Sequence, residues 1–272
     1  MFPTLELSDA AFEWEGLRWI TVNSPALGHR ADLTLFVPPE ATKRSDVPLV
    51  ILLHGVYGSH WAWALKGGAH RTAARLIREG VLPPLVLAMP SDGLWGDGSG
   101  YVPHVPPPGA PTAFAPDFDR WIVTDVPAAV IQAIPCVSPN SPRFVCGLSM
   151  GGFGALRLAA RHPRWVRAAS GHSSATHASQ LERFSSGPLS AYSALPMDQS
   201  VLAAMTVNRD RLPPIRFDCG DEDFLIEPKR QLHHDHLATG ISHHYAEFPG
   251  GHTWPYWAEH LEDSLRFFAK HL

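Results

Sequence analysis

"RFVCGLSMGGFGALRLAARHP", residues 143–163, joins an apolar run to apolar residues at helical spacing. The run at 144–146 is typical of a buried strand, and residues 155–159 predict a helix. Between them, Ser149 stands at the centre of the pentapeptide GLSMG (147–151). Glycines at these positions permit a tight, strained turn that exposes the serine hydroxyl beside the free amides of the next helix. The stretch therefore predicts a strand–turn–helix unit that presents a nucleophilic serine.

Short β-type runs alternate with helical patterns along the rest of the chain. The first two runs, residues 17–24 and 31–38, flank a turn at 25–28 and predict an antiparallel hairpin. Further strands are expected at 48–55, 84–90, 143–149, 167–173, 215–220 and 243–250. Several of these are continuous apolar runs, which is typical of parallel strands buried on both faces.

Helical patterns lie between and after these strands. We expect helices at residues 60–79, 125–134 and 256–271, and Pro127 falls in the first turn of the second, where its missing N–H costs little. The last helix carries a single apolar stripe. Such alternation predicts an α/β fold with a mostly parallel central sheet, an antiparallel N-terminal hairpin and helices on both faces.

The length of 272 residues fits one α/β domain, residues 1–272. Two segments interrupt the alternation of strands and helices. Residues 91–117 are crowded with Gly and Pro and carry Trp95 and Tyr101, and a loop of this length predicts a binding function. Residues 174–212 contain short helical pieces and are expected to form a helical insert over the sheet.

The composition excludes several classes of protein. The net charge of −4 is mild and the basic residues are scattered, so we expect no nucleic-acid partner. No apolar run reaches the 18 or so residues that a membrane span needs, and no signal peptide is visible, so we expect a cytoplasmic protein. A secreted chain that has lost its leader would have the same sequence. The three cysteines are too widely spaced for a disulfide framework or a zinc site, and they are expected as buried thiols.

A serine nucleophile needs a base and an acid that orients this base, and in such folds the chain order is serine, acid, histidine. Asp221 and Asp223 both follow the strand at 215–220, and spacing alone does not choose between them. Asp218 lies within that strand and is expected to make a structural hydrogen bond or to face solvent. His252 follows the last strand behind two glycines and is the predicted base. His172 is a rival only if the order is unusual.

The backbone amides that would stabilise an oxyanion are expected from two turns. One is the amide of Met150, directly after the serine, and the other is the amide of Val56 in the turn after the strand at 48–55. His54 is expected to shape this second turn.

Four motifs in this order resemble the esterase D-like branch of the α/β-hydrolases: "LLHGVYGSH" (52–60), "GLSMGGFGA" (147–155), "CGDEDFL" (219–225) and "GGHTWPYW" (250–257). This branch includes S-formylglutathione hydrolases, feruloyl and acetyl-xylan esterases, tributyrin-type esterases and mycolyltransferases. The resemblance implies an α/β-hydrolase fold and selects Asp223 over Asp221 as the acid. One departure is that S-formylglutathione hydrolases usually have threonine and cysteine after the oxyanion glycine, where this chain has Val56 and Tyr57.

The resemblance implies a serine carboxylic-ester hydrolase with the triad Ser149, Asp223 and His252, acting through an acyl-enzyme without a cofactor. The aromatic residues of the expected loops favour small acyl or aryl esters as its substrates. An acyltransferase or a thioesterase with the same triad is the alternative. The alternative outside the enzymes is a protein with a hydrolase fold that binds ligands without catalysis. The oligomeric state is left open.

Aromatic residues in the expected loops are candidates for binding the ester. Tyr57, Trp95 and Trp254 are predicted to contact the substrate, with Trp61, Trp63, Tyr101 and Tyr256 as further candidates, although aromatic residues also fill cores. His233 and His236 lie three apart on an expected helix, and we interpret them as a solvated surface rather than as a metal site.

Overall fold

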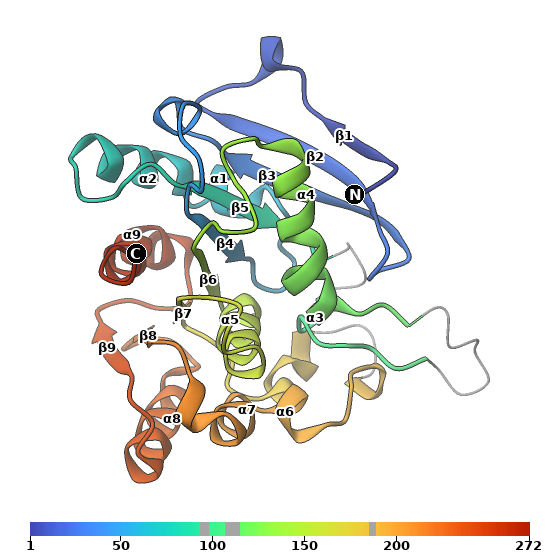
Figure 1. The fold of residues 1–272 in the computed structure, drawn as a ribbon. Helices are drawn as coiled ribbons and strands as arrows, with labels where there is room; N and C mark the ends of the chain where they lie inside the picture. Colours follow the sequence, from blue (N-terminus) through green and yellow to red (C-terminus); the bar gives the residue numbers. More distant parts are fainter. Residues whose placement is uncertain (93–97, 107–114, 185–188) are drawn as a thin grey trace.

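The computed structural model describes residues 1–92, 98–106, 115–184 and 189–272. Nine strands form one sheet in the order β1-β2-β3-β5-β4-β6-β7-β8-β9 (Figure 1). They are β1 (Leu5–Leu7), β2 (Leu17–Ser24), β3 (His29–Phe36), β4 (Leu49–Leu53), β5 (Val86–Pro90), β6 (Arg143–Leu148), β7 (Ala168–His172), β8 (Ile215–Gly220) and β9 (His244–Phe248). Pairing is antiparallel from β1 to β5 and parallel from β5 through β4 to β9. The predicted mostly parallel sheet with its N-terminal hairpin is confirmed, and β1 is a strand that the sequence reasoning missed.

Helices cover both faces of the sheet, as predicted (Figure 1). One face packs against α1 (Ala62–Leu65), α2 (Ala69–Arg78) and α9 (Trp254–Ala269). The other packs against α4 (Val126–Ala133), α5 (Met150–Arg161), α7 (Val201–Val207) and α8 (Ile226–Thr239). Two short helices complete the set, α3 (Phe118–Arg120) and α6 (Pro196–Gln199).

The register of the parallel strands places one set of loops at a common edge. Leu53 at the end of β4 pairs with Gly147 near the end of β6, and Leu148 pairs with His172 at the end of β7. His172 in turn lies opposite Asp218 of β8. Because parallel strands end on the same side, the segments that follow β4, β6 and β8 meet there, which is where ligands bind in open α/β sheets.

Two predicted helices differ from the observed ones. The helix expected at 60–79 is divided into α1 and α2, because Gly68 adopts a left-handed φ of 61° between them. The helix expected at 125–134 is observed as α4 with Pro127 in its first turn, as predicted, but helical structure also runs back from it through a π-turn at Trp121–Asp125 to α3. The amide of Val126 bonds to the carbonyl of Trp121, so a wide turn directly precedes the proline, which has no N–H to continue the ladder.

The two interrupting segments are described in part. Trp95 falls outside the described residues, so its predicted contact with substrate stays a prediction. Tyr101 is fully buried, and its hydroxyl donates to the carbonyl of His54, so it belongs to the core and not to a binding surface. The segment 174–212 contains α6, α7 and three 3₁₀ turns, and α7 shares the core on the α5 face of the sheet.

The interpretation of the histidine-rich helix as a solvated surface is wrong for part of α8. His236 is fully buried and packs edge-on against Phe217 of β8, and neither ring nitrogen has a hydrogen-bond partner among the described residues. Burial lowers the pKa of His236 to about 3, so this ring is neutral in the folded protein. The 3.6-residue period turns one face of α8 onto the sheet, although few of its residues are apolar. Among the described residues, no group of His, Cys, Asp and Glu could hold a metal ion.

Lys229, two turns earlier on α8, is also fully buried. Its ammonium lies 4.8 Å from the centre of the Phe217 ring and has no hydrogen-bond partner in the part of the chain that the structure describes. Burial lowers the pKa of Lys229 to about 8, against 10.5 for an exposed lysine. The native state therefore bears a cost for this charge at neutral pH, because a buried ammonium loses its hydration.

We expect Lys229→Met to raise the free energy of unfolding at pH 7 by about 1–3 kcal/mol, because it removes a buried, unpaired charge but keeps the apolar volume. The cost is fully present below pH 8 and disappears as the pH rises through the pKa of the unfolded lysine. Urea unfolding of the parent and Lys229→Met at pH 7 and pH 10.5 measures this difference in stability, and Lys43→Met, at an exposed lysine, is the control. A Lys229→Met protein less stable than the parent at pH 7 would contradict this account.

Candidate active site

Ser149 occupies the sharp turn between β6 and α5. Its backbone has φ 53° and ψ −118°, a strained conformation for a residue with a side chain. A Cβ on Gly147 would lie 2.1 Å from the carbonyl oxygen of Gly151, so only glycine lets the strand and helix approach this closely. The amide of Ser149 donates to the carbonyl of His172, and its own carbonyl accepts from Ala175. These backbone bonds hold the hydroxyl at the edge of the sheet.

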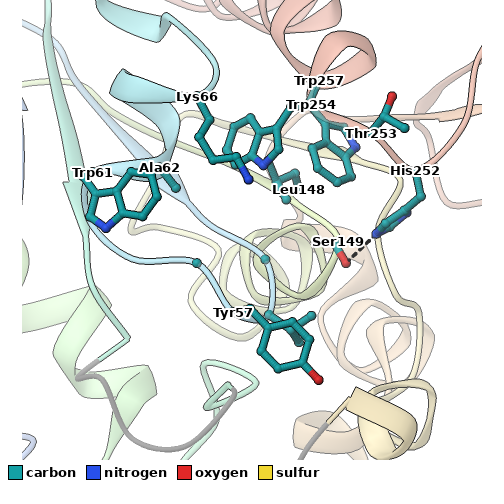
Figure 2. A pocket seen from close by; sticks show the side chains of 13 residues that line it. Tyr57, Trp61, Ala62, Lys66, Leu148, Ser149, His252, Thr253, Trp254 and Trp257 are labelled. Carbon is teal, nitrogen blue, oxygen red and sulfur yellow. Dashed lines mark hydrogen bonds between the residues drawn. The ribbon is translucent and has the colours of Figure 1, made fainter.

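His252 and Asp223 reach this hydroxyl from two other loops. His252 lies between β9 and α9, and its Nε2 is 3.0 Å from the Oγ of Ser149 (Figure 2). Its Nδ1 is 2.8 Å from one carboxylate oxygen of Asp223 and 3.1 Å from the other. The structure thus brings together the three side chains of the predicted triad, which lie in three separate loops.

Asp223 is only 2% exposed. Burial alone would raise the pKa of Asp223, but its hydrogen bond with His252 and the nearby imidazole lower it below its usual value. The amide of Leu225 also donates to this carboxylate, at 2.8 Å. An ionised carboxylate in this position can orient the imidazole and stabilise its protonated form.

Asp221, the other acid that spacing left open, has a different partner. Its side chain is exposed and accepts a 3.0 Å hydrogen bond from the amide of Gly250. Asp221 therefore contacts the glycine loop that precedes the histidine, not the imidazole itself. The distances favour Asp223, in agreement with the resemblance.

His172, the rival base, lies in a different, fully buried network. Its Nδ1 is 2.9 Å from Asp218 and its Nε2 is 2.8 Å from the hydroxyl of Ser264 in α9. Burial alone would lower the pKa of His172, but the carboxylate of Asp218 raises it to about 9. The ring is therefore protonated at neutral pH and cannot accept a proton from a serine. Asp218 is structural, one of its two expected roles, and also accepts from Tyr256 of α9.

The two predicted amide donors flank Ser149. Met150 is the first residue of α5, and amides of a first helical turn have no partner within the helix. Val56 follows Gly55, at which an added Cβ would lie 3.2 Å from the Cβ of Ser149. This close approach places the turn after β4 directly against the serine, where an amide can reach an oxyanion. His54 bonds through Nδ1 to the carbonyl of Gly55 and shapes this turn, as expected.

A pocket of about 300 Å³ opens above the serine. Its lining is mostly apolar and aromatic, with few polar side chains (Figure 2). It is lined by Gly55, Val56, Tyr57, Gly58, Trp61, Ala62, Lys66, Leu148, Ser149, His252, Thr253, Trp254 and Trp257. Of the aromatic candidates, Tyr57, Trp61 and Trp254 line the pocket, whereas Trp63 and Tyr256 are buried in the core.

The sequence reasoning missed three residues around the site, two beside the imidazole and one at the far end of the pocket wall. Trp257 meets the ring of His252 edge-on at 4.9 Å between centres, and Phe224 lies 4.4 Å from it. Lys66, at the end of α1, points over the ring of Trp254. Phe224 directly follows Asp223, and Trp257 lies five residues after His252. This proximity in the sequence could have indicated that both lie near the imidazole. Lys66 offered no such signal.

Comparison with known proteins places this geometry in context. A model of the family described as putative esterase matches residues 24–268. An acetyl esterase of Caldicellulosiruptor saccharolyticus is 23% identical over 242 residues, which cover 83% of this chain and 84% of that one. A solved ferulic acid esterase has a TM-score of 0.77 at 20% identity, over 98% of this chain and 99% of that one. An S-formylglutathione hydrolase from Agrobacterium tumefaciens has a TM-score of 0.76 at 18% identity, over 100% and 99%.

The two aspartates can be separated by a matched pair of variants. Asp223→Asn should lower kcat for p-nitrophenyl acetate by about 10³–10⁴-fold, because an amide cannot stabilise the imidazolium and favours the wrong tautomer. Asp221→Asn should lower it less than about fivefold, since it loses one exposed hydrogen bond to a loop amide. Steady-state kinetics of both proteins measures the difference. Equal losses would remove the basis for choosing Asp223.

Proposed function

The chain belongs to the putative esterase family and is a carboxylic ester hydrolase, and from this premise we propose that it acts through a covalent acyl-enzyme on Ser149. One observation carries the proposal. The hydrogen bonds from Ser149 to His252 and from His252 to Asp223 form a continuous row of 3.0 Å and 2.8 Å. This is the arrangement that a weak hydroxyl nucleophile requires for activation.

In the first half of the reaction, Nε2 of His252 accepts the proton of Ser149 as Oγ attacks the ester carbonyl. The carbonyl oxygen gains negative charge, which the amides of Val56 and Met150 stabilise. Asp223 stabilises the imidazolium that forms. The tetrahedral intermediate then expels the alcohol, which takes its proton from His252 and leaves the acyl group on the serine.

In the second half, water takes the place of the alcohol. His252 accepts a proton from the water as its oxygen attacks the acyl carbon, and the same two amides stabilise the second oxyanion. The carboxylic acid leaves as Ser149 regains its proton. An acyltransferase would differ only in that an acceptor alcohol replaces this water.

The substrate class follows from the pocket. Its volume of about 300 Å³ fits a short acyl chain or a single aromatic ring, and Trp61 and Trp254 supply flat apolar walls. Of the two similar esterases, one is named for a short acyl group, acetyl, and the other for an aromatic acid, ferulic acid. We therefore propose small acyl or aryl esters. Thioesters are the less favoured alternative, because Val56 and Tyr57 replace the threonine and cysteine usual in S-formylglutathione hydrolases.

No helix among the described residues combines the length and the apolar character needed to cross a membrane.

Ser149→Ala should lower the turnover of p-nitrophenyl acetate by at least ~10³-fold, because the acyl-enzyme can no longer form. Mass spectrometry after incubation with a fluorophosphonate should find one adduct on the parent protein and none on the variant. A Ser149→Ala protein with the parent's turnover would disprove the proposed mechanism.

A panel of p-nitrophenyl acetate, butyrate and decanoate together with a ferulate ester tests the substrate class. We expect kcat/KM to be highest for acetate, butyrate or ferulate, because the aromatic walls of the pocket suit a short acyl group or a flat ring, whereas a long flexible chain loses more conformational entropy on binding. The same assays with added methanol or a sugar separate hydrolysis from acyl transfer by the products formed. Fastest cleavage of the decanoate would contradict the proposed class.

A further inference from the structure

The pocket beside Ser149 contains an ammonium group that the proposed mechanism does not use. Lys66 lines the pocket, and no Asp or Glu is among the lining residues. Its Nζ lies 5.4 Å from the centre of the Trp254 ring. Within the described parts of the chain, no carboxylate lies within ion-pair distance of Lys66. The amino group is thus oriented by an indole face and has no counter-ion.

The position of Lys66 follows from a row of ring contacts along one wall of the pocket. The ring centre of His252 is 4.9 Å from that of Trp257, which is 5.4 Å from that of Trp254. Lys66 covers the far side of this row, beyond Trp254. Figure 2 shows His252 on one side of Ser149, and Lys66 with Trp61 on the other.

This arrangement decides which half of an ester faces Lys66. The leaving alcohol takes its proton from His252 and therefore lies beside the imidazole. The acyl half extends from the carbonyl carbon in the other direction, along Trp254 and towards Lys66. A group carried at the end of the acyl chain would meet the ammonium.

The wall that carries Lys66 is firmly supported. Trp254 packs edge-on against buried Trp63, with 5.7 Å between ring centres. An added Cβ on Gly67 would lie 3.0 Å from the Trp254 ring, so the backbone next to Lys66 is in close contact with this indole. A cation–π contact of this kind orients the ammonium and leaves its N–H donors available.

We propose that Lys66 determines specificity by binding a carboxylate at the end of the acyl chain, so that the preferred substrates are half-esters of short dicarboxylic acids. This inference rests on the proposed acyl-enzyme function of Ser149. A pocket with aromatic walls, one ammonium and no lining carboxylate attracts an anionic acyl chain and repels a cationic one.

The test compares ethyl half-esters of malonic, succinic, glutaric and adipic acids with the matched neutral amides, in which –CONH₂ replaces the free carboxylate. Ethanol release gives kcat/KM for each pair, and the ratio of charged to neutral substrate is the readout. For the chain length that fits, the parent protein should prefer the charged substrate by about fivefold. This corresponds to ~1 kcal/mol, the upper range for an exposed ion pair.

Variants at position 66 assign the preference to this side chain. Lys66→Met should reduce the ratio to about one, Lys66→Glu should bring it below one, and Lys66→Arg should retain most of it. Because the ratio is taken within each protein, a general loss of activity does not affect it. Lys43→Met, at an exposed lysine that does not line the pocket, is the matched control and should keep the parent's ratio.

Two outcomes would overturn the proposal. One is a parent ratio of one or less at every chain length, and the other is an unchanged ratio in Lys66→Met. Either result leaves the acyl-enzyme function standing as long as Ser149→Ala is inactive on the neutral amides. If Ser149→Ala hydrolyses these esters at the parent's rate, the proposed function itself fails.

Discussion

The strained turn at Ser149 is the constraint on which the rest of the site depends. Its positive φ costs free energy, of order 1–3 kcal/mol for a residue in such a conformation, and glycine at 147 avoids the clash that a Cβ would make with Gly151. Two backbone hydrogen bonds, to His172 and from Ala175, help to hold it, together with a core in which β6 and α5 are almost entirely buried. The strain serves a purpose, because it points the hydroxyl at the loop that carries His252.

The position of His252 depends in turn on a buried charged network behind the sheet edge. His172 and Asp218 form an ion pair, and Tyr256 and Ser264 of α9 bond to this pair. The network therefore joins the strand that holds the amide of Ser149 to the helix that follows His252. Asp218 is the carboxylate that both His172 and Arg216 contact, so removing it would leave buried positive charge without compensation. The same side chains that stabilise the fold thus fix the distance between the proposed nucleophile and its base.

The first turn of α9 links this support to substrate binding. Trp257 contacts the imidazole, and Trp254 packs between Trp257 and buried Trp63. One helix therefore positions the proposed base and forms the wall that leads to Lys66. A rigid aromatic wall loses little conformational entropy when an acyl chain binds. The specificity that we propose for Lys66 therefore needs no loop movement, only the contact of its side chain with the end of the acyl chain.

The sequence by itself determined the alternation of strands and helices, the serine at its turn and the loops that hold the acid and base, because apolar periodicity and glycine positions are local signals. Spacing did not choose between Asp221 and Asp223, since both fall in one turn and only the path of the distant histidine loop decides which carboxylate meets the imidazole. The burial of His236 and the place of Lys66 in the pocket were likewise decided by tertiary structure. Both depend on which elements pack together, and a polar residue carries no pattern that reveals its neighbours across the fold.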